Sequence, residues 1–367
     1  MNREPSLLIP VDRARLYANN FDALRLAMAL LVVWSHCFAL YFGSERSEPL
    51  SRLTAGFYNS GNVGVWVFFI ISGFLITQSF ERSSTIAGYM AKRVRRIYPA
   101  YLVATSVCAF VVTPLFVADP AFVLTPLEIV RTLGANLLLA NHFPVDPLFA
   151  GNPVGAVNGS LWSIRFEFLC YIGVLLLGLC GLLARRHLVL LLYATLVAIW
   201  CWLDATGQKP GISQWLIDTI GWPYRWLWVL PNFLAGMLLW LYRDHVRRSS
   251  ALLLTGIAAC LTAFHLPVPP IAATIASHIL VPPVMAYAVL WVAFHPALPL
   301  HRAGRFGDFS YGTYLYAYVI QQMLIARLAI GFAPFVLLSF ACSLLAGVAS
   351  WYLVERRFLI RKPVAEA

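Results

Sequence analysis

The chain has few charged residues. Asp, Glu, Lys and Arg make up 12% of its 367 residues, whereas hydrophobic residues make up 60%. Soluble domains carry about 25% charged residues, so this composition excludes an ordinary soluble protein and predicts an all-α protein that crosses a membrane several times. The formal net charge of +11 does not indicate a nucleic-acid partner, because the basic residues fall in loops between apolar runs, as is usual in membrane proteins.

Metal-binding and disulfide patterns are also missing. The 7 cysteines lie in apolar stretches and form no CxxC pair, and the histidines show no HExxH spacing, so we expect neither a disulfide framework nor a metal site. No internal repeat of the kind found in many transporters is evident. We assign no chemistry to seven of the eight histidines, which are His142, His187, His245, His265, His278, His295 and His301.

Ten apolar runs are candidates for membrane spans, which need about 20 residues each. With the N-terminus inside, most of the 27 Lys and Arg residues fall on the cytoplasmic side, which favours ten spans with both termini cytoplasmic. We therefore predict about ten transmembrane helices around a polar central cavity, in the cytoplasmic membrane. The predicted spans are 21–41, 61–80, 100–118, 160–182, 188–204, 227–242, 251–265, 272–294, 310–330 and 334–355.

The spans leave room for a single membrane-embedded domain over residues 1–367. It comprises a cytoplasmic N-terminal segment (1–20), a long outer loop (119–159) and a cytoplasmic tail (356–367). Residues 1–20 lack an apolar core, so we expect the first span to direct insertion. Within the outer loop, the segment 128–140 is expected to be interfacial or re-entrant.

Two ionisable side chains interrupt the first apolar run. Arg25 and His36 are eleven residues apart, which in one helix places them on the same face, about 16 Å apart along the axis. Such side chains are costly at membrane depth, usually face a cavity and mark a functional site by default. With the N-terminus inside, Arg25 lies toward the cytoplasm and His36 toward the outer surface.

A carboxylate is expected at the depth of His36 on another helix. Glu167 lies about 10 Å below the outer end of the run 160–182. A buried carboxylate beside an imidazole orients the ring and raises its basicity, which suits a general base acting on a hydroxyl. The alternative is a structural His36–Glu167 pair that only locks two helices together.

Ser72 and Gly73 lie near the middle of the second run. Small residues there let another backbone or a ligand approach closely, and ordinary helix packing is the alternative to a ligand.

Arg93 and Arg96 are three residues apart and share a helical face. Paired guanidiniums suit phosphate groups, such as those of a nucleotide-like donor. The alternatives for this pair are the usual excess of positive charge on the cytoplasmic side of a membrane protein and contact with lipid headgroups.

Polar residues continue into the middle of the run 310–330. Tyr311, Tyr314 and Tyr318 fall on one helical face, and the polar pattern extends to Gln321. Such a face lines a cavity or another helix rather than lipid.

In this order, the segments resemble the acyltransferase-3 family of bacterial integral-membrane O-acyltransferases, over roughly residues 20–355. The family's basic residue, ten intervening positions and a histidine match Arg25 and His36. Its SGFLIT-like run matches Ser72 to Thr77, and its RxxR motif matches Arg93 and Arg96.

The resemblance continues in the later spans. A tryptophan–serine run leading to a glutamate is matched by Trp162, Ser163 and Glu167, and an SYGxYLYxFPxQQ segment is similar to Ser310–Gln322. The chain departs from the pattern at Ile164-Arg165, where relatives often have Leu-Pro, and at Tyr318-Val319, where Phe-Pro is common. No hydrolase-like domain follows the membrane domain, so a transfer that requires one would need a separate periplasmic partner.

The resemblance implies transfer of an acyl group, most often acetyl from acetyl-CoA, to a sugar hydroxyl of a lipid-linked or extracytoplasmic glycan, such as a lipopolysaccharide or an exopolysaccharide. His36, supported by Glu167, would be the general base, or His36 would accept the acyl group transiently. Arg25 would steer the thioester. The implied donor site comprises Arg93, Arg96, Ser72 and Gly73, and the implied acceptor site comprises Trp162, Tyr311, Tyr314 and Gln321.

Two other classes of function stay open on the sequence alone. The same polar residues would serve a transporter or flippase for a lipid-linked saccharide, although the missing inverted repeat argues against it. The chain would otherwise be a non-catalytic membrane partner of a glycan-assembly complex. Besides the acyl-CoA and the glycan, membrane lipids are expected partners in every case.

Overall fold

The computed structural model describes residues 7–10, 12, 16, 18–119, 121–209 and 211–359. Over these residues the chain is all-α, and its β-structure is limited to one isolated bridge between Leu7 and Arg247. The all-α fold class predicted from composition is confirmed. The expected cytoplasmic segments 1–20 and 356–367 fall partly outside the described residues, including their basic residues Arg3, Arg13, Arg15, Arg361 and Lys362.

Seven helices are long and apolar enough to cross a membrane, counted over the described residues. Each overlaps one of the predicted spans. They are α2 (Phe21–Phe42), α4 (Ser60–Glu81), a rod of α5 (Ile86–Val107), η1 (Cys108–Val112) and α6 (Thr113–Phe116), a rod of η2 (Gly159–Leu161) and α8 (Trp162–Leu179), α9 (Arg186–Thr206), α13 (Pro270–Ala293), and a rod of α15 (Phe332–Ser350), η4 (Trp351–Glu355) and α16 (Arg356–Phe358).

The other three predicted spans are helices that do not meet both requirements for length and hydropathy, so the number of ten spans stays a prediction. They are α11 (Pro223–Leu241), α12 (Ser250–His265) and α14 (Ser310–Arg327). Shorter helices occupy the connections, namely α3 (Pro49–Leu53), α7 (Pro126–Leu137), α10 (Gln214–Ile220) and η3 (Leu300–Phe306).

The third span begins much earlier than the expected 100–118. The side chain of Thr85 caps α5 by accepting a hydrogen bond from the Gly88 amide, and the helix runs on through Pro99. The basic cluster at 92–96 hides this start in a hydropathy pattern. Arg93 and Arg96 therefore lie within α5 rather than in a segment ahead of it.

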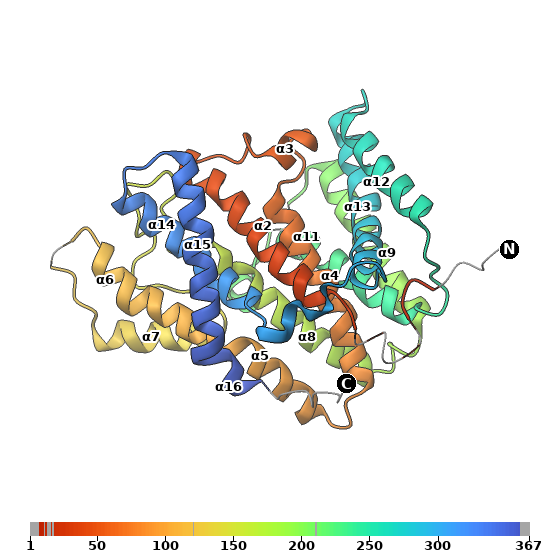
Figure 1. Cartoon of the computed structure of the whole chain (residues 1–367), viewed down its shortest axis with the longest axis horizontal. Coiled ribbons are helices and arrows are strands. Elements are labelled where there is room, and N and C mark those ends of the chain that lie inside the picture. Colours follow the sequence, from red (N-terminus) through yellow and green to blue (C-terminus); the bar gives the residue numbers. More distant parts are fainter. Residues whose placement is uncertain are drawn as a thin grey trace. The chain divides into compact units, whose positions relative to one another are not determined.

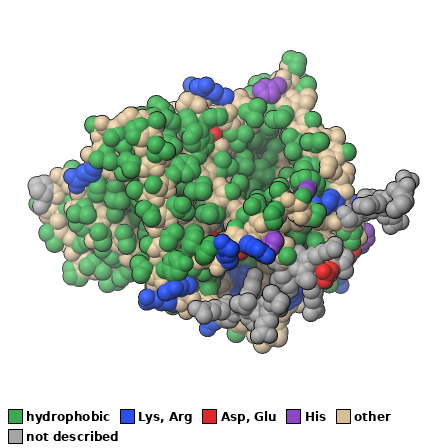
Figure 2. Space-filling model, viewed as in Figure 1, with side chains coloured by type: hydrophobic (Ala, Val, Ile, Leu, Met, Phe, Trp, Pro, Cys, Tyr) green, Lys and Arg blue, Asp and Glu red, His purple; other side chains and the backbone are tan. Residues whose placement is uncertain are grey.

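Exposed apolar side chains cover the outward faces of the candidate spans. Leu191 on α9 is 61% exposed, and Leu345 on α15 is 68% exposed. Figure 2 shows that hydrophobic side chains dominate the face in view, with few Lys and Arg side chains on it. Apolar surface of this kind costs about 25 cal/mol per Å² in water, so these faces suit a lipid environment.

The chain forms two compact units. The first unit comprises Met1–Met28, Arg46–Ser83 and Phe166–Arg305, and the second comprises Ala29–Glu45, Ser84–Arg165 and Phe306–Ala367. The start of α2, with Arg25, thus belongs to the first unit, and the remainder, with His36, belongs to the second. The single domain expected over 1–367 stays a prediction.

In the first unit, α4 packs closely along α11 (Figure 1). A Cβ added to Gly73 would lie 1.9 Å from the Phe233 carbonyl oxygen, and one added to Gly236 would lie 2.1 Å from the Ile70 carbonyl oxygen. The two glycines therefore let the backbones of α4 and α11 meet, as small residues do at membrane helix interfaces. Helices α9, α11 and α13 contact one another beside this pair, and α12 packs on α13.

In the second unit, α14 and α15 run side by side (Figure 1). The end of the long loop 119–159 is fastened to α14 through Gln322. Its Nε2 donates to the carbonyl oxygens of Val154 at 2.6 Å and Ala156 at 2.7 Å, and its Oε1 accepts from Asn152 at 2.9 Å. This part of the predicted loop is therefore held against a candidate site helix.

Candidate functional site

His36 lies on α2, in the second unit, and its ring meets the ring of Tyr318 edge to face at 5.1 Å. Its Nδ1 is buried and has no hydrogen-bond partner among the described residues. A buried polar atom left unpaired costs free energy, so it needs a reason to persist. A group that exchanges protons with a ligand supplies such a reason.

Tyr318 is held in place by a close contact with the start of the η2–α8 rod. A Cβ on Gly159 would lie 2.7 Å from the Tyr318 ring. One turn earlier, the Tyr314 hydroxyl donates to the Ser160 carbonyl oxygen at 2.6 Å and accepts from the Ser163 hydroxyl at 2.7 Å. Trp162, the first residue of α8, is half-buried. The predicted face of α14 thus packs on the start of α8, within one unit.

Gln321 is fully buried and joins α14 to α2. Its Nε2 donates to the Val33 carbonyl oxygen at 3.0 Å and to Cys37 Sγ at 3.1 Å, while its Oε1 has no partner in the part of the chain that the structure describes. Cys37 is the residue after His36. Gln321 is therefore placed to fix the helix that carries the histidine.

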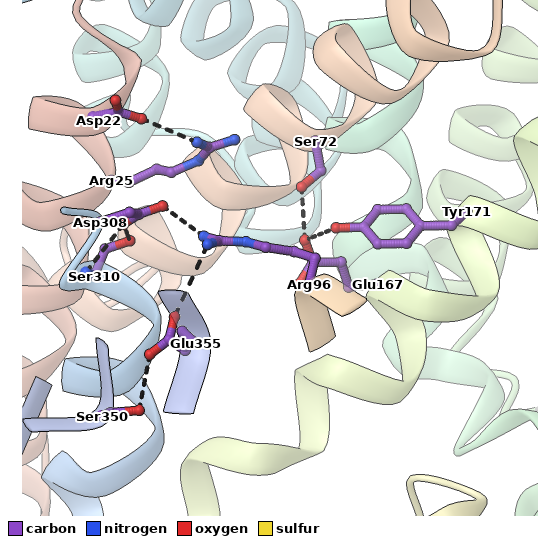
Figure 3. Close-up of polar contacts among 10 residues, drawn as sticks. All are labelled: Asp22, Arg25, Ser72, Arg96, Glu167, Tyr171, Asp308, Ser310, Ser350 and Glu355. Atoms are coloured by element: carbon purple, nitrogen blue, oxygen red, sulfur yellow. Dashed lines mark hydrogen bonds and ion pairs between the residues drawn. The ribbon is translucent and has the colours of Figure 1, made fainter. Parts of the chain in front are cut away.

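Arg96 lies between two carboxylates (Figure 3). Its guanidinium is 2.6 Å from Asp308 Oδ2 and 4.0 Å from Glu355 Oε2. Glu355 is only 3% exposed and also accepts from the Ser350 hydroxyl at 2.8 Å. The Asp308 carboxylate in turn accepts from the amide and hydroxyl of Ser310, the first residue of α14. This Arg96 cluster ties α5 to both ends of the α14–α15 hairpin.

Aromatic rings flank both arginines of the RxxR pair. The Arg96 guanidinium lies 5.5 Å from the centre of the Tyr311 ring, and that of Arg93 lies 5.6 Å from the Tyr89 ring. The Tyr311 hydroxyl donates to the Ile97 carbonyl oxygen at 3.0 Å. Such cation–π contacts leave the edge of the guanidinium able to bind an anion.

In the first unit, Glu167 is bound by two hydroxyl groups (Figure 3). Its Oε1 accepts from the Ser72 hydroxyl at 2.7 Å and from the Tyr171 hydroxyl, one helical turn further along α8. Arg25 pairs with Asp22 at 3.4 Å within α2. The expected close approach at Gly73 is made by the α11 backbone, which matches the helix-packing alternative and leaves its part in donor binding a prediction.

The structure therefore sorts the predicted site residues into two groups. The pairing of His36 with Glu167 stays a prediction, because the two residues belong to different units. The first unit holds Arg25, Ser72, Gly73 and Glu167, and the second holds His36, Arg93, Arg96, Trp162, Tyr311, Tyr314 and Gln321.

Sequence reasoning missed several members of these groups. Tyr171 lies four residues after Glu167, a spacing that places both side chains on one helical face. Glu355 is a lone acid at the end of an apolar run, and such a residue calls for a basic partner. Asp308 precedes the α14 tyrosines and accepts a hydrogen bond from the amide of Ser310, the first residue of the helix. No cluster of three or more His, Cys, Asp or Glu suited to a metal ion occurs within the described ranges.

Comparison with known proteins adds the decisive observation. The family described as an acyltransferase domain matches residues 19–355, which is nearly the whole chain. This chain belongs to the acyltransferase-3 family. The match covers every predicted site residue, from Arg25 to Gln321.

Three relatives of this acyltransferase cover most of its length. An O-acetyl transferase of Shigella phage Sf6 is 33% identical over 94% of this chain and 97% of that protein. Nodulation protein 10 of Rhizobium leguminosarum bv. viciae is 27% identical over 93% of both chains. The exopolysaccharide production protein ExoZ of Rhizobium meliloti is 29% identical over 84% of this chain and 92% of that protein. No solved structure matches the acyltransferase.

Proposed function

We propose that this acyltransferase moves an acetyl group from cytoplasmic acetyl-CoA to a sugar hydroxyl of a lipid-linked or extracytoplasmic polysaccharide, in the inner membrane of a bacterium. The observation that carries the proposal is the similarity, over 94% of the chain, to an O-acetyl transferase. The similarity to an exopolysaccharide production protein supports a polysaccharide acceptor. An enzyme is thereby favoured over a transporter or a non-catalytic partner.

His36 is assigned to the acceptor hydroxyl. Its unpartnered Nδ1 supports a role in proton transfer. In the direct route, the imidazole takes the hydroxyl proton while the hydroxyl oxygen bonds to the thioester carbonyl carbon. The C–S bond then breaks, and the CoA thiolate leaves and takes up that proton. In the alternative route, the imidazole first displaces CoA and carries the acetyl group before the hydroxyl receives it.

Glu167 is assigned to support of the histidine. Its two hydroxyl donors, Ser72 and Tyr171, hold the carboxylate in one orientation. A carboxylate so held can stabilise the imidazolium that forms when His36 takes the proton.

The donor is assigned to the arginines. Arg93 and Arg96 would bind the CoA phosphates, and Arg25 would act near the thioester. Because two carboxylates already partly neutralise Arg96, the exposed side chains of Lys92 and Arg95 would add to the phosphate contact.

A reconstituted assay tests this function. Protein purified into proteoliposomes receives acetyl-CoA labelled in the acetyl group, together with lipid-linked saccharide extracted from the host. The proposal predicts label in an alkali-labile ester on the saccharide. Label that stays in acetyl-CoA would contradict it, and label transferred only from succinyl-CoA would correct the acyl group. As a control, Trp202→Leu on the exposed face of α9 should leave the activity unchanged.

A further inference from the structure

The first unit contains a second cluster of polar and aromatic side chains that no part of the proposed chemistry uses. Asp204, at the end of α9, pairs with His278 on α13, with 2.7 Å between Oδ2 and Nε2. The other carboxylate oxygen accepts from the Tyr224 hydroxyl on α11. The Trp200 ring stacks on the His278 ring with centres 3.6 Å apart. The cluster thus joins α9, α11 and α13.

A cavity of about 140 Å³ opens beside the pair. Aromatic rings form most of its wall, and the polar groups come from Asp204, His278, Ser277 and Thr274. Tyr58 donates its hydroxyl to Ser277 at 2.8 Å, and burial raises the pKa of Tyr58 to about 12, so this hydroxyl keeps its proton. The aromatic wall consists of Phe57, Tyr58, Trp66, Trp200, Tyr224 and Trp228.

The His278 ring carries a polar atom that lacks a hydrogen-bond partner among the described residues. A carboxylate has no proton to donate, so His278 Nε2 carries the hydrogen of the pair and the neutral ring leaves Nδ1 as an acceptor. Nδ1 is buried without a hydrogen bond in the described part of the chain, and the residue is 5% exposed. Because the atom itself is inaccessible, a ligand hydroxyl would satisfy it once the ring has turned toward the cavity.

The size and lining of the cavity indicate the chemical class of ligand. A cavity of roughly 150 Å³ holds one six-membered ring, so the space takes a single ring rather than a disaccharide. Aromatic faces pack against the C–H faces of a pyranose, and a few fixed polar groups orient its hydroxyls. With the topology expected from the charges, these ends of α9, α11 and α13 lie on the outer side, where a polysaccharide is available.

We propose that the cavity beside Asp204 and His278 is a binding subsite for one saccharide ring of the acceptor, with a ring hydroxyl donating to His278 Nδ1. The identity of the ring as part of the acceptor rests on the function proposed above. The binding itself does not depend on an acyl donor, so the two proposals fail separately.

The test is binding of monosaccharides to the purified full-length chain in nanodiscs, without acyl-CoA. The probes are the methyl pyranosides of glucose, galactose, mannose and rhamnose, together with tetrahydropyran, which has the same ring without hydroxyls. Saturation-transfer NMR and tryptophan fluorescence titration report binding. We expect saturable binding of at least one methyl pyranoside and none of tetrahydropyran.

Two variants assign the binding to this cavity. Trp228 is 39% exposed at the rim, so Trp228→Leu should fold normally and weaken binding about tenfold. His278→Phe keeps the stack on Trp200 and should remove the hydroxyl recognition. The matched control, Trp202→Leu on the exposed face of α9, should bind as the wild type does.

Three outcomes would overturn the subsite. They are the absence of saturable binding for every pyranoside, equal binding of tetrahydropyran, and unchanged binding by Trp228→Leu. Pyranoside binding by a protein that transfers no acetyl group would leave the subsite standing and refute the proposed function. Acetyl transfer together with unchanged binding by Trp228→Leu would refute the subsite and leave the proposed function standing.

Discussion

The Ser72 hydroxyl donates to the Glu167 carboxylate at 2.7 Å, joining α4 to α8 within the first unit. The sequence suggested Ser72 for the donor site and Glu167 as a partner of His36, and it did not suggest that the two touch. Because the hydroxyl proton of Ser72 is engaged by Glu167, the simplest role for Ser72 is to position that carboxylate.

A double-mutant cycle tests this role. A hydrogen bond to a charged group is worth about 1.5–3 kcal/mol, so Ser72→Ala should lower kcat about tenfold or more and leave KM for acetyl-CoA unchanged. Once Glu167→Gln is present, Ser72→Ala should cost little more, because the bond no longer has a charged acceptor.

The control for the cycle is Ser83→Ala, since the Ser83 hydroxyl donates only to the Ser79 carbonyl oxygen at 2.7 Å. It should leave kcat unchanged. Full additivity of the Ser72 and Glu167 effects would contradict the positioning role, and a raised KM for acetyl-CoA in Ser72→Ala would restore Ser72 to the donor site.

The Arg96 cluster predicts a difference between the two arginines of the RxxR pair. Arg96→Ala leaves the buried Glu355 without its basic partner, and breaking a buried ion pair costs about 3–5 kcal/mol. Since Arg96 is itself partly exposed, we expect the free energy of unfolding to fall by an amount near the lower end of this range. Arg93→Ala should instead raise KM for acetyl-CoA with kcat unchanged, as expected when uniform binding is lost.

Thermal unfolding in detergent and steady-state kinetics measure the two effects. The double variant Arg96→Ala with Glu355→Gln should recover part of the stability, because it removes the unpaired charge. Equal stability of the two single arginine variants would show that the Arg96 cluster contributes nothing to the fold.

The contact between α4 and α11 predicts a strong effect of one methyl group. Gly73→Ala would place a Cβ 1.9 Å from the Phe233 carbonyl oxygen, and overpacking of this kind costs about 1–3 kcal/mol or more. Gly173→Ala on α8 is the matched control, because no heavy atom lies within 4 Å of its added Cβ.

We expect Gly73→Ala to lower the thermal midpoint and the yield of folded protein, measured by fluorescence-detected gel filtration. Gly173→Ala should leave both unchanged or slightly raised, since alanine favours helix over glycine. A Gly73→Ala protein as stable as the wild type would show that the two helices separate without cost.

Much of the fold followed from the sequence, because long apolar runs have few alternatives in a membrane. The all-α class and a helix at every predicted span are examples. The start of α5 was missed, because the charged cluster 92–96 interrupts the apolar run on which the prediction of spans relied. The helix nevertheless begins ahead of this cluster, where Thr85 caps it. Helix α12 has 16 residues, fewer than the roughly 20 that a span usually needs. The exact number of membrane crossings therefore stays a prediction.

The candidate site was only partly predictable, for a physical reason. Motifs identify residues such as His36 and Arg96 one helix at a time, whereas the partners come from elsewhere in the sequence. Asp308 and Glu355 lie more than 200 residues from Arg96, and no local periodicity connects them. The Asp204–His278 pair was overlooked because a lone histidine in an apolar helix carries no spacing signal until packing brings a carboxylate to it.

The most direct test of the central claim is the transfer rate of a His36→Ala protein. Purified wild-type and variant proteins in proteoliposomes receive labelled acetyl-CoA and lipid-linked saccharide, and binding of acetyl-CoA is measured alongside. Loss of a general base costs about 10²–10⁴-fold. The account predicts a loss of that size with acetyl-CoA binding retained, and a His36→Ala protein that acetylates the saccharide at the wild-type rate would contradict it.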